Sequence, residues 1–314
     1  SRFFPASRQG TALGVFGAGN IGSAVTKLLA PLVMVAGGWM MVAKVWAIAL
    51  AVTAVLFYLF AKDDPSLAQR RRDGVKPVPF GEQMAPLKNL QVWRFSLYYF
   101  FVFGGFVALA LWLPHYLVGA YGMEVGHAGI VAACYSIPAS LFRVVGGWLS
   151  DRIGARRVMY WTFGVSALCT FLLAYPDTVY VVQGIHGELR FRLAIGVVMF
   201  TVLVFVLGFF MSLGKAAVYK HIPVYYPNHV GAVGGVVGMI GGLGGFILPI
   251  VFGALNDAIG IWSSCFMLLF VVVSAALGWM HFAIRRMEHR HFPQLARETD
   301  LPEAIDASAA DRRA

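Results

Sequence analysis

Charged side chains are scarce in this chain. Asp, Glu, Lys and Arg make up 13% of its 314 residues, whereas a soluble domain carries roughly 25%. Hydrophobic residues make up 59%, and the mean hydropathy is +0.72. Several apolar runs reach the roughly 20 residues that a transmembrane helix needs. The composition excludes a soluble globular domain and predicts an all-α integral membrane protein.

Acidic residues are missing from the apolar runs, and catalytic motifs are missing from the whole chain. No Asp or Glu lies inside any run, so the sequence offers no carboxylate relay for protons. The HExxH and GxSxG motifs and Cys/His metal clusters are absent as well. The histidines all fall in loops or near the ends of runs. We therefore expect no enzymatic activity, no metal and no other cofactor.

Cysteine is rare too. The three cysteines, Cys134, Cys169 and Cys265, lie far apart, each inside an apolar run. This placement is typical of small buried side chains rather than of a disulfide framework. We expect all three to be buried and free.

Eight apolar runs follow one another along the chain. They cover about residues 10–37, 42–61, 93–116, 125–149, 158–175, 193–213, 230–255 and 261–282. The polar stretch 62–92 is expected to be a linker between a first unit, 1–61, and a second, 93–284. The tail, residues 285–314, is expected to be largely disordered. Between the fifth and sixth runs, the alternation in residues 178–193 predicts a small β-hairpin on the periplasmic side.

Positive charge lies mostly on one side of these spans. With eight spans, sixteen Lys and Arg residues fall on one side and three on the other, which assigns the first side to the cytoplasm. We expect loops 62–92, 150–157 and 215–229 and the tail to be cytoplasmic, in a multi-pass protein of the inner (plasma) membrane. The net charge of +10 follows from these loops, and no nucleic-acid partner is expected.

One charge, Arg143, lies inside the fourth run. A guanidinium stays protonated, and such a charge at a helix centre is unfavourable by about 2.5 to 3.5 kcal/mol on translocon scales. Arg143 is therefore expected to face a water-filled path, a partner charge or an anionic ligand. The alternative is a structural cation capped by carbonyl groups. Asn20 and Lys27 share one face of the first run, where they are expected to line a polar path. The alternatives are that Asn20 forms a hydrogen bond to another helix and that Lys27 extends to the membrane interface.

The residues after Arg143 read GWLSDRIGARR, from Gly147 to Arg157. This resembles the GxxxDRxGxRR loop of the major facilitator superfamily, in which an acid close to a helix end pairs with basic groups. The residues of this gating loop are Gly147, Asp151, Arg152, Gly154, Arg156 and Arg157. The resemblance implies a partial major facilitator fold, with the last two helices of the first half and a complete second half. The first four helices are then expected to be missing from this chain.

Two glycine-rich stretches, in the first and seventh runs, resemble the paired signatures of the nitrate/nitrite porter family. Their glycines include Gly17, Gly19, Gly22, Gly234, Gly238, Gly241, Gly242 and Gly245. The pairing, together with an arginine eight residues before Asp151, is more specific than either glycine run alone. The resemblance covers nearly the whole chain except the tail.

This resemblance implies a substrate site. Arg143 matches the arginine of the second half, Phe103 an aromatic wall, Tyr99 the nearby tyrosine and Asn20 the asparagine. The implied function is secondary transport of nitrate or nitrite by alternating access in the lipid bilayer. Coupling to protons or to anion exchange stays open, with Lys27 as a possible participant. The alternatives are a facilitator for another small anion or organic solute, and a membrane sensor that transports nothing.

Overall fold

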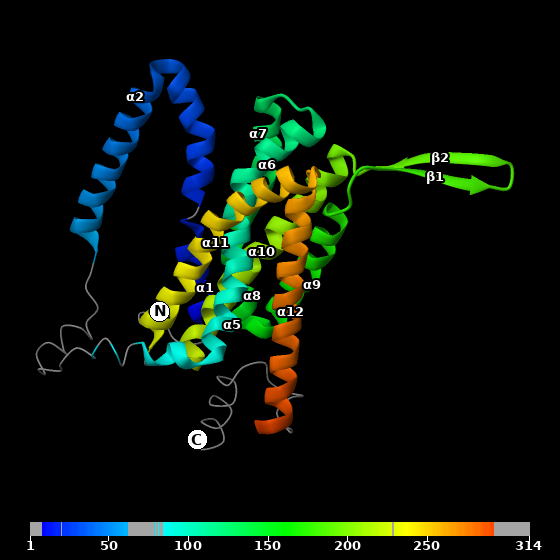
Figure 1. The fold of residues 1–314 in the computed structure, drawn as a ribbon. Coiled ribbons are helices and arrows are strands. Elements are labelled where there is room, and N and C mark those ends of the chain that lie inside the picture. The colour runs from blue at the N-terminus through cyan, green and yellow to red at the C-terminus, as the bar shows by residue number, and fades with distance from the viewer. Residues whose placement is uncertain are drawn as a thin grey trace, which may run out of the picture.

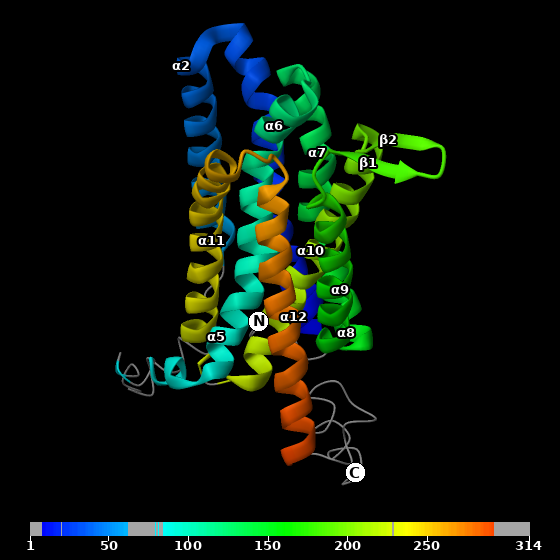
Figure 2. The same ribbon diagram turned by 45° about the vertical axis from the view of Figure 1, so that its right-hand side comes forward.

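The computed structural model describes residues 8–19, 21–61, 79, 81, 84–227 and 229–291. The described part is a bundle of helices with one projecting hairpin, as Figures 1 and 2 show. Most of the expected linker and the tail after residue 291 lie outside the described residues. Asn20 also lies outside them.

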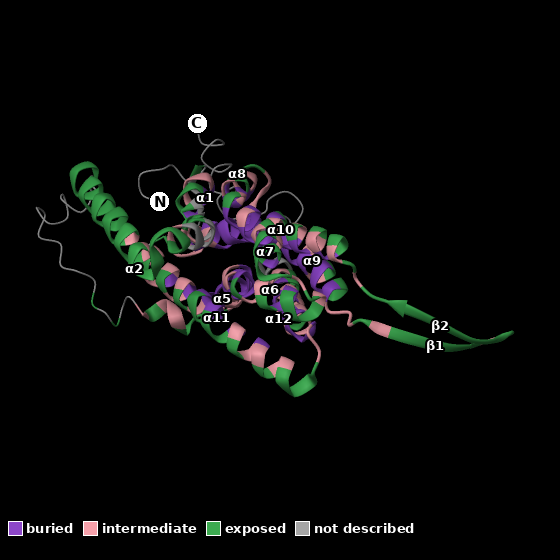
Figure 3. Cartoon of the chain, turned by 90° about the horizontal axis from the view of Figure 1, so that it is seen from above, coloured by how far each residue is buried: buried purple, intermediate pink, exposed green. Residues whose placement is uncertain are grey.

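The first two runs form two antiparallel helical rods. The first rod consists of α1 (Gln9–Ala18) and the part of α2 (Ile21–Phe60) before Gly37, and the second rod is the rest of α2. Helix α2 doubles back at Gly37 and Gly38, where Gly38 has a φ of 72° (Figure 1). A left-handed conformation suits glycine because it has no Cβ. Seen from above, the rod that leads to Phe60 is almost wholly exposed (Figure 3).

The second unit is a bundle of long helices around a buried core (Figures 1 and 3). Its elements are η2 (Ala85–Lys88), α5 (Leu90–Tyr99), the π-helical η3 (Phe100–Gly105), α6 (Phe106–Tyr121), α7 (Val125–Leu141), α8 (Arg143–Ile153), α9 (Ala155–Leu173), α10 (Val197–Tyr225), α11 (Val230–Ile259) and α12 (Ser264–His291). Asn89 caps α5, because its side chain accepts a 2.9 Å hydrogen bond from the backbone N–H of Gln91. Helices α7 and α8 meet at Phe142 with a bend of 41°.

Five of the described helices are long and apolar enough to cross a membrane, or six if α7 and α8 form one bent span. The sequence predicts eight spans. Two sources account for the difference. First, the first run is divided between the short α1 and the start of α2. Second, α9 carries Arg156 and Arg157 in its first turn, and these residues lower the mean hydropathy of the helix.

Two segments expected to be loops are largely helical. The loop 150–157 is largely helical: α8 runs to Ile153, α9 begins at Ala155, and only Gly154, with φ 91°, lies between them. The loop 215–229 is also wrong, because α10 continues to Tyr225. Lys215 and Lys220 follow the apolar run there, but both are buried. The Nζ of Lys215 donates a hydrogen bond to the carbonyl oxygen of Ala139, and the Nζ of Lys220 donates one to Asp151. Helix α12 extends to His291, so the first residues of the expected tail 285–314 are helical, and the rest of the tail lies outside the described residues.

The cysteine prediction is correct in part. Cys169 and Cys265 are buried, whereas Cys134 is exposed on the outside of α7, and all three are free. An apolar run has the same composition whether a position faces protein or lipid, so the sequence alone does not separate the two.

The predicted strands are present. β1 (Thr178–Gly184) and β2 (Gly187–Leu193) pair antiparallel, with Thr178 opposite Leu193 and Gly184 opposite Gly187. The hairpin projects sideways from the bundle, crosswise to the helices, in all three views (Figures 1 to 3).

Close helix contacts in the second unit depend on glycine. A Cβ added to Gly146 of α8 would lie 2.5 Å from the Cα of Leu213 in α10. Because that neighbour is backbone, the two helices would have to separate. We expect Gly146→Ala to lower the free energy of unfolding by about 1 to 3 kcal/mol, as overpacking does, measured by thermal unfolding in detergent.

The matched control is Gly129→Ala in α7, because no described atom lies within 4 Å of its added Cβ. This change should leave stability equal or raise it by about 0.5 to 1 kcal/mol, since alanine favours helix. Equal effects of the two substitutions would contradict the close contact between α8 and α10.

Candidate functional site

Arg143 occupies the first position of α8, directly after the break at Phe142. Its exposed fraction is 5%, and its Nε has no hydrogen-bond partner among the described residues. The guanidinium carbon lies 5.8 Å from the ring centroid of Tyr219. A buried donor without a partner is unfavourable, so this geometry leaves a donor available for a ligand.

Aromatic side chains surround this cation. The rings of Tyr99 and Phe103 stack with centroids 5.0 Å apart and an interplanar angle of 9°. The ring of Tyr219 meets the ring of Tyr99 edge-on, with centroids 4.8 Å apart, and this same Tyr219 ring lies 5.8 Å from the guanidinium carbon of Arg143. Phe103 lies in the π-helical segment η3, a local irregularity that is frequent at functional sites. The structure therefore brings together three of the four predicted binding residues.

Some signature glycines make room for these side chains. A Cβ on Gly17 would lie 1.9 Å from the Nε of Arg143, and one on Gly241 would lie 2.4 Å from the ring of Tyr99. A Cβ on Gly238 would lie 2.7 Å from the Tyr219 hydroxyl, which donates a 3.2 Å hydrogen bond to the carbonyl oxygen of Gly234. These glycines let helices α1 and α11 approach the guanidinium and the rings.

The other signature glycines have different surroundings. No described atom lies within 4 Å of a Cβ placed on Gly22 or Gly242, and Gly19 would meet only the carbonyl oxygen of Phe16 at 3.3 Å. Gly245 faces the side chain of Val107 at 2.9 Å. Only part of the signature therefore contacts the candidate site.

Lys215 is a second basic side chain buried in the bundle, and the sequence pattern did not indicate its burial. Its exposed fraction is 0%, its Nζ donates a 2.8 Å hydrogen bond to the carbonyl oxygen of Ala139, and it lies 3.1 Å from the ring centroid of Phe106. Tyr219 lies four residues further along α10, hence on the same helix face. No Pro lies between the end of the sixth run and Pro223. This absence of a helix breaker could have predicted that α10 continues past residue 213.

The gating-loop residue Asp151 joins three helices. Its Oδ1 accepts a 3.0 Å hydrogen bond from the N–H of Gly10 and a 2.8 Å bond from the Nζ of Lys220. Its Oδ2 accepts from both the N–H and the hydroxyl of Thr11, each at 2.7 Å. The carboxylate thus satisfies the first N–H groups of α1, at the positive end of that helix, and pairs with α10.

The remaining gating-loop residues flank this contact. Gly147 approaches α1 closely, because its added Cβ would lie 2.1 Å from the carbonyl oxygen of Gly10. Arg152 lies over the ring of Trp148 at 4.3 Å, and Arg156 and Arg157 lie in the first turn of α9. The side chains of Asn20 and Lys27 are not described, so their roles stay predictions.

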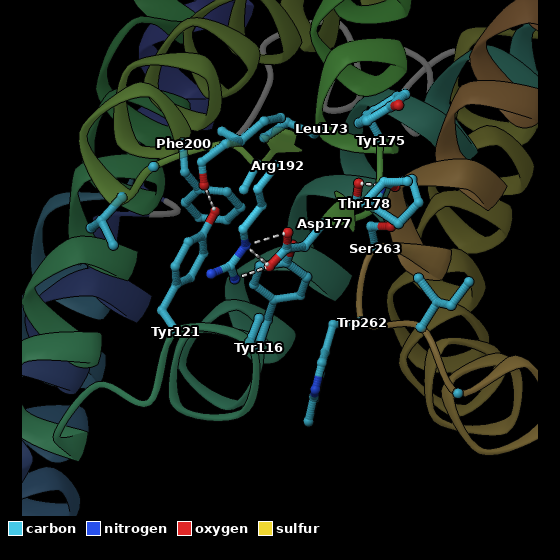
Figure 4. A pocket seen from close by; sticks show the side chains of 18 residues that line it. Tyr116, Tyr121, Leu173, Tyr175, Asp177, Thr178, Arg192, Phe200, Trp262 and Ser263 are labelled. Atoms are coloured by element: carbon cyan, nitrogen blue, oxygen red, sulfur yellow. Dashed lines mark hydrogen bonds and ion pairs between the residues drawn. The ribbon is translucent and has the colours of Figure 1, made fainter. Parts of the chain in front are cut away.

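A separate cavity of about 710 Å³ lies at the base of the hairpin (Figure 4). Tyr116, Tyr121, Phe200 and Trp262 form its aromatic walls, and none of the residues around Arg143 lines it. Within it the Nε of Arg192 donates a 2.8 Å hydrogen bond to Asp177. This bond lowers the pKa of the Asp177 carboxyl, so the pair persists at neutral pH and is lost in strong acid.

The helical bundle is that of a known transporter class. The family model of the Major Facilitator Superfamily matches residues 1–182 and, again, residues 120–307. The crystal structure of a superfamily transporter, FucP in the outward conformation, superposes with a TM-score of 0.53 at 18% identity, over 79% of this chain and 54% of that chain. The fold is therefore the major facilitator fold of multi-pass membrane proteins, as the sequence predicts.

Three proteins of similar sequence identify the family within this superfamily. The probable nitrate/nitrite antiporter NarK1 of Thermus thermophilus is 41% identical over 96% of this chain and 70% of its own length. The nitrite extrusion protein of Bacillus subtilis is 31% identical over 92% and 67%, and the probable nitrate transporter NarT of Staphylococcus haemolyticus is 30% identical over 85% and 63%. The chain belongs to the nitrate/nitrite porter family of the major facilitator superfamily. It spans about two thirds of the length of these relatives.

The contact at Asp151 can be tested by removing its charge. Asp151→Asn leaves the buried Lys220 without its counter-charge; their side chains are 9% and 5% exposed. Breaking a buried pair in this way costs about 3 kcal/mol or more. We expect a lower unfolding temperature in detergent and faster hydrogen exchange of the α1 amides.

The control is Asp177→Asn, which removes an ion pair of exposed side chains at the base of the hairpin. It should change the unfolding temperature little and leave exchange in α1 unaltered. Unchanged exchange in α1 for Asp151→Asn would show that the carboxylate does not hold that helix.

Proposed function

We propose that this protein carries nitrate, nitrite or both across the inner (plasma) membrane by alternating access, with the anion bound by Arg143. The observation that carries the proposal is the buried guanidinium of Arg143, whose Nε lacks a partner among the described residues. The names of the relatives, which are nitrate or nitrite transporters, support the choice of anion.

The chemistry of the site fits a flat, weakly basic, monovalent anion. A guanidinium presents its N–H donors in a planar fork that matches an oxyanion better than an ammonium does. The stacked rings of Tyr99 and Phe103 offer a flat wall without charge. The side chain of Lys215 is fully buried, and its Nζ donates a 2.8 Å hydrogen bond to the carbonyl oxygen of Ala139. Asn20 completes the proposed ligand set.

The contact at Asp151 supplies a gate in this proposal. Asp151 links α1 of the first half to α8 and α10 of the second. The excess of Lys and Arg assigns this end to the cytoplasm and the hairpin to the outside. Breaking the Asp151 contacts opens the cytoplasmic end as the halves rock about the central site. Coupling is by anion exchange or by protons, with Lys27 as a candidate participant.

Two other functions remain as alternatives. A facilitator for another small anion or organic solute would bind its substrate at the same residues, and a sensor would bind an anion without carrying it. A flux assay with purified protein in liposomes separates a carrier from a sensor. Competition by other anions in that assay separates the substrates.

Arg143→Lys tests the ligand role of the guanidinium. The substitution keeps the charge and removes the planar fork, so we expect nitrate binding to weaken by about 10- to 100-fold, the range for a lost hydrogen bond to a charged group. Binding is measured by calorimetry and transport by uptake into proteoliposomes. Arg285→Lys is the control, because Arg285 is exposed near the end of α12 and should keep wild-type binding and uptake. Unaltered uptake by Arg143→Lys would overturn the site assignment.

The two kinds of signature glycine provide a further test. Gly17→Ala places a methyl group on the guanidinium of Arg143 and must displace it. We expect at least a tenfold loss of nitrate affinity with the protein still folded. Gly22→Ala, in the same signature, meets no described atom within 4 Å and should bind as the wild type does. Equal losses in both variants would mean that the signature acts through helix flexibility and not through room for Arg143.

A further inference from the structure

The hairpin has two chemically different faces. In an antiparallel pair, directly opposed residues point to the same side of the sheet. The register therefore places Tyr180, Val182, Leu189, Phe191 and Leu193 on one side, with Tyr180 and Phe191 stacked at 5.3 Å. We call these five residues the apolar face. The opposite face carries Val179, Val181, Gln183, Glu188, Arg190 and Arg192.

All five side chains of the apolar face are exposed, and Ile185 at the turn is 99% exposed. A hairpin of two strands is at best marginally stable in water without a surface to pack on. A cluster of exposed apolar side chains bordered by charges marks an interaction site. Within the described part of the chain, nothing covers this face.

The position of the hairpin indicates which surface its apolar face contacts. It leaves the bundle between the end of α9 and the start of α10 and runs crosswise to the helices (Figures 1 and 2). Exposed apolar residues on those helix ends, Phe171, Leu172, Val198 and Met199, continue toward it. In a multi-pass protein, such residues at helix ends face lipid. The apolar face therefore extends the lipid-facing surface outward at the level where spans end.

We propose that the hairpin lies on the membrane surface, with its apolar face in the acyl boundary and the face with Arg190 and Arg192 toward headgroups and water. This is how amphipathic interfacial segments bind a bilayer. The bond between Arg192 and Asp177 ties the end of β2 to the segment that follows α9. The hairpin then acts as an in-plane anchor for the α9–α10 end of the bundle.

Two adjacent valines of β1 give a matched test. Val181 and Val182 are 53% and 46% exposed and point to opposite faces. Each is changed to Cys in a Cys134→Ala background, which leaves Cys169 and Cys265 buried, and is labelled with a nitroxide in the protein reconstituted into liposomes. Collision rates with oxygen, which enters lipid, and with a water-soluble nickel chelate are then measured.

We expect the ratio of oxygen to nickel collisions to be several-fold higher for Val182→Cys than for Val181→Cys. Equal ratios at the two positions would overturn the proposal, because the hairpin would then stand in water. A label at 182 that is shielded from both reagents and broadened by a second spin would overturn it too, in favour of pairing with another copy. Neither substitution touches the proposed anion site or the bundle core, so each outcome is independent of nitrate transport.

Discussion

A permanent cation buried in an apolar bundle is the constraint on which the candidate site depends. Arg143 cannot lose its charge, so its surroundings must compensate for lost water. The ring of Tyr219, whose centroid lies 5.8 Å from the guanidinium carbon, does so in part, and the Nε stays without a partner in the described structure. The bend at Phe142 and the missing Cβ of Gly17 follow from this need, because together they admit a large planar group between α1 and α8.

The sequence predicts the features that have a strong local cause. Apolar runs, the alternating strands and the single intramembrane arginine each depend on residues close together in the chain. The family resemblance added Tyr99 and Phe103, and the structure places both beside Arg143 or its partner ring. These predictions work because composition and spacing decide the outcome before tertiary contacts form.

Lys215 and Tyr219 show where such prediction ends. A lysine after an apolar run is typical of a loop, and the rule of positive charge inside the cell assigned this segment to the cytoplasm. The contacts of the Nζ of Lys215 inside the bundle are with the carbonyl oxygen of Ala139 and the ring of Phe106, both distant in sequence. The glycine signatures have the same limit, since spacing alone cannot separate Gly17, whose added Cβ would meet the side chain of Arg143, from Gly22, whose added Cβ would meet no described atom within 4 Å.

Helix α10 carries neighbouring contacts to both the cation and the carboxylate. Tyr219 lies against Arg143, and the next residue, Lys220, holds Asp151 at 2.8 Å. One residue of an α-helix rises only about 1.5 Å, and its backbone hydrogen bonds make the turn rigid. A displacement of Tyr219 along the helix axis therefore reaches Lys220 almost undiminished. Under the proposed function, this single turn of α10 therefore links the anion at Arg143 directly to the contacts of Asp151.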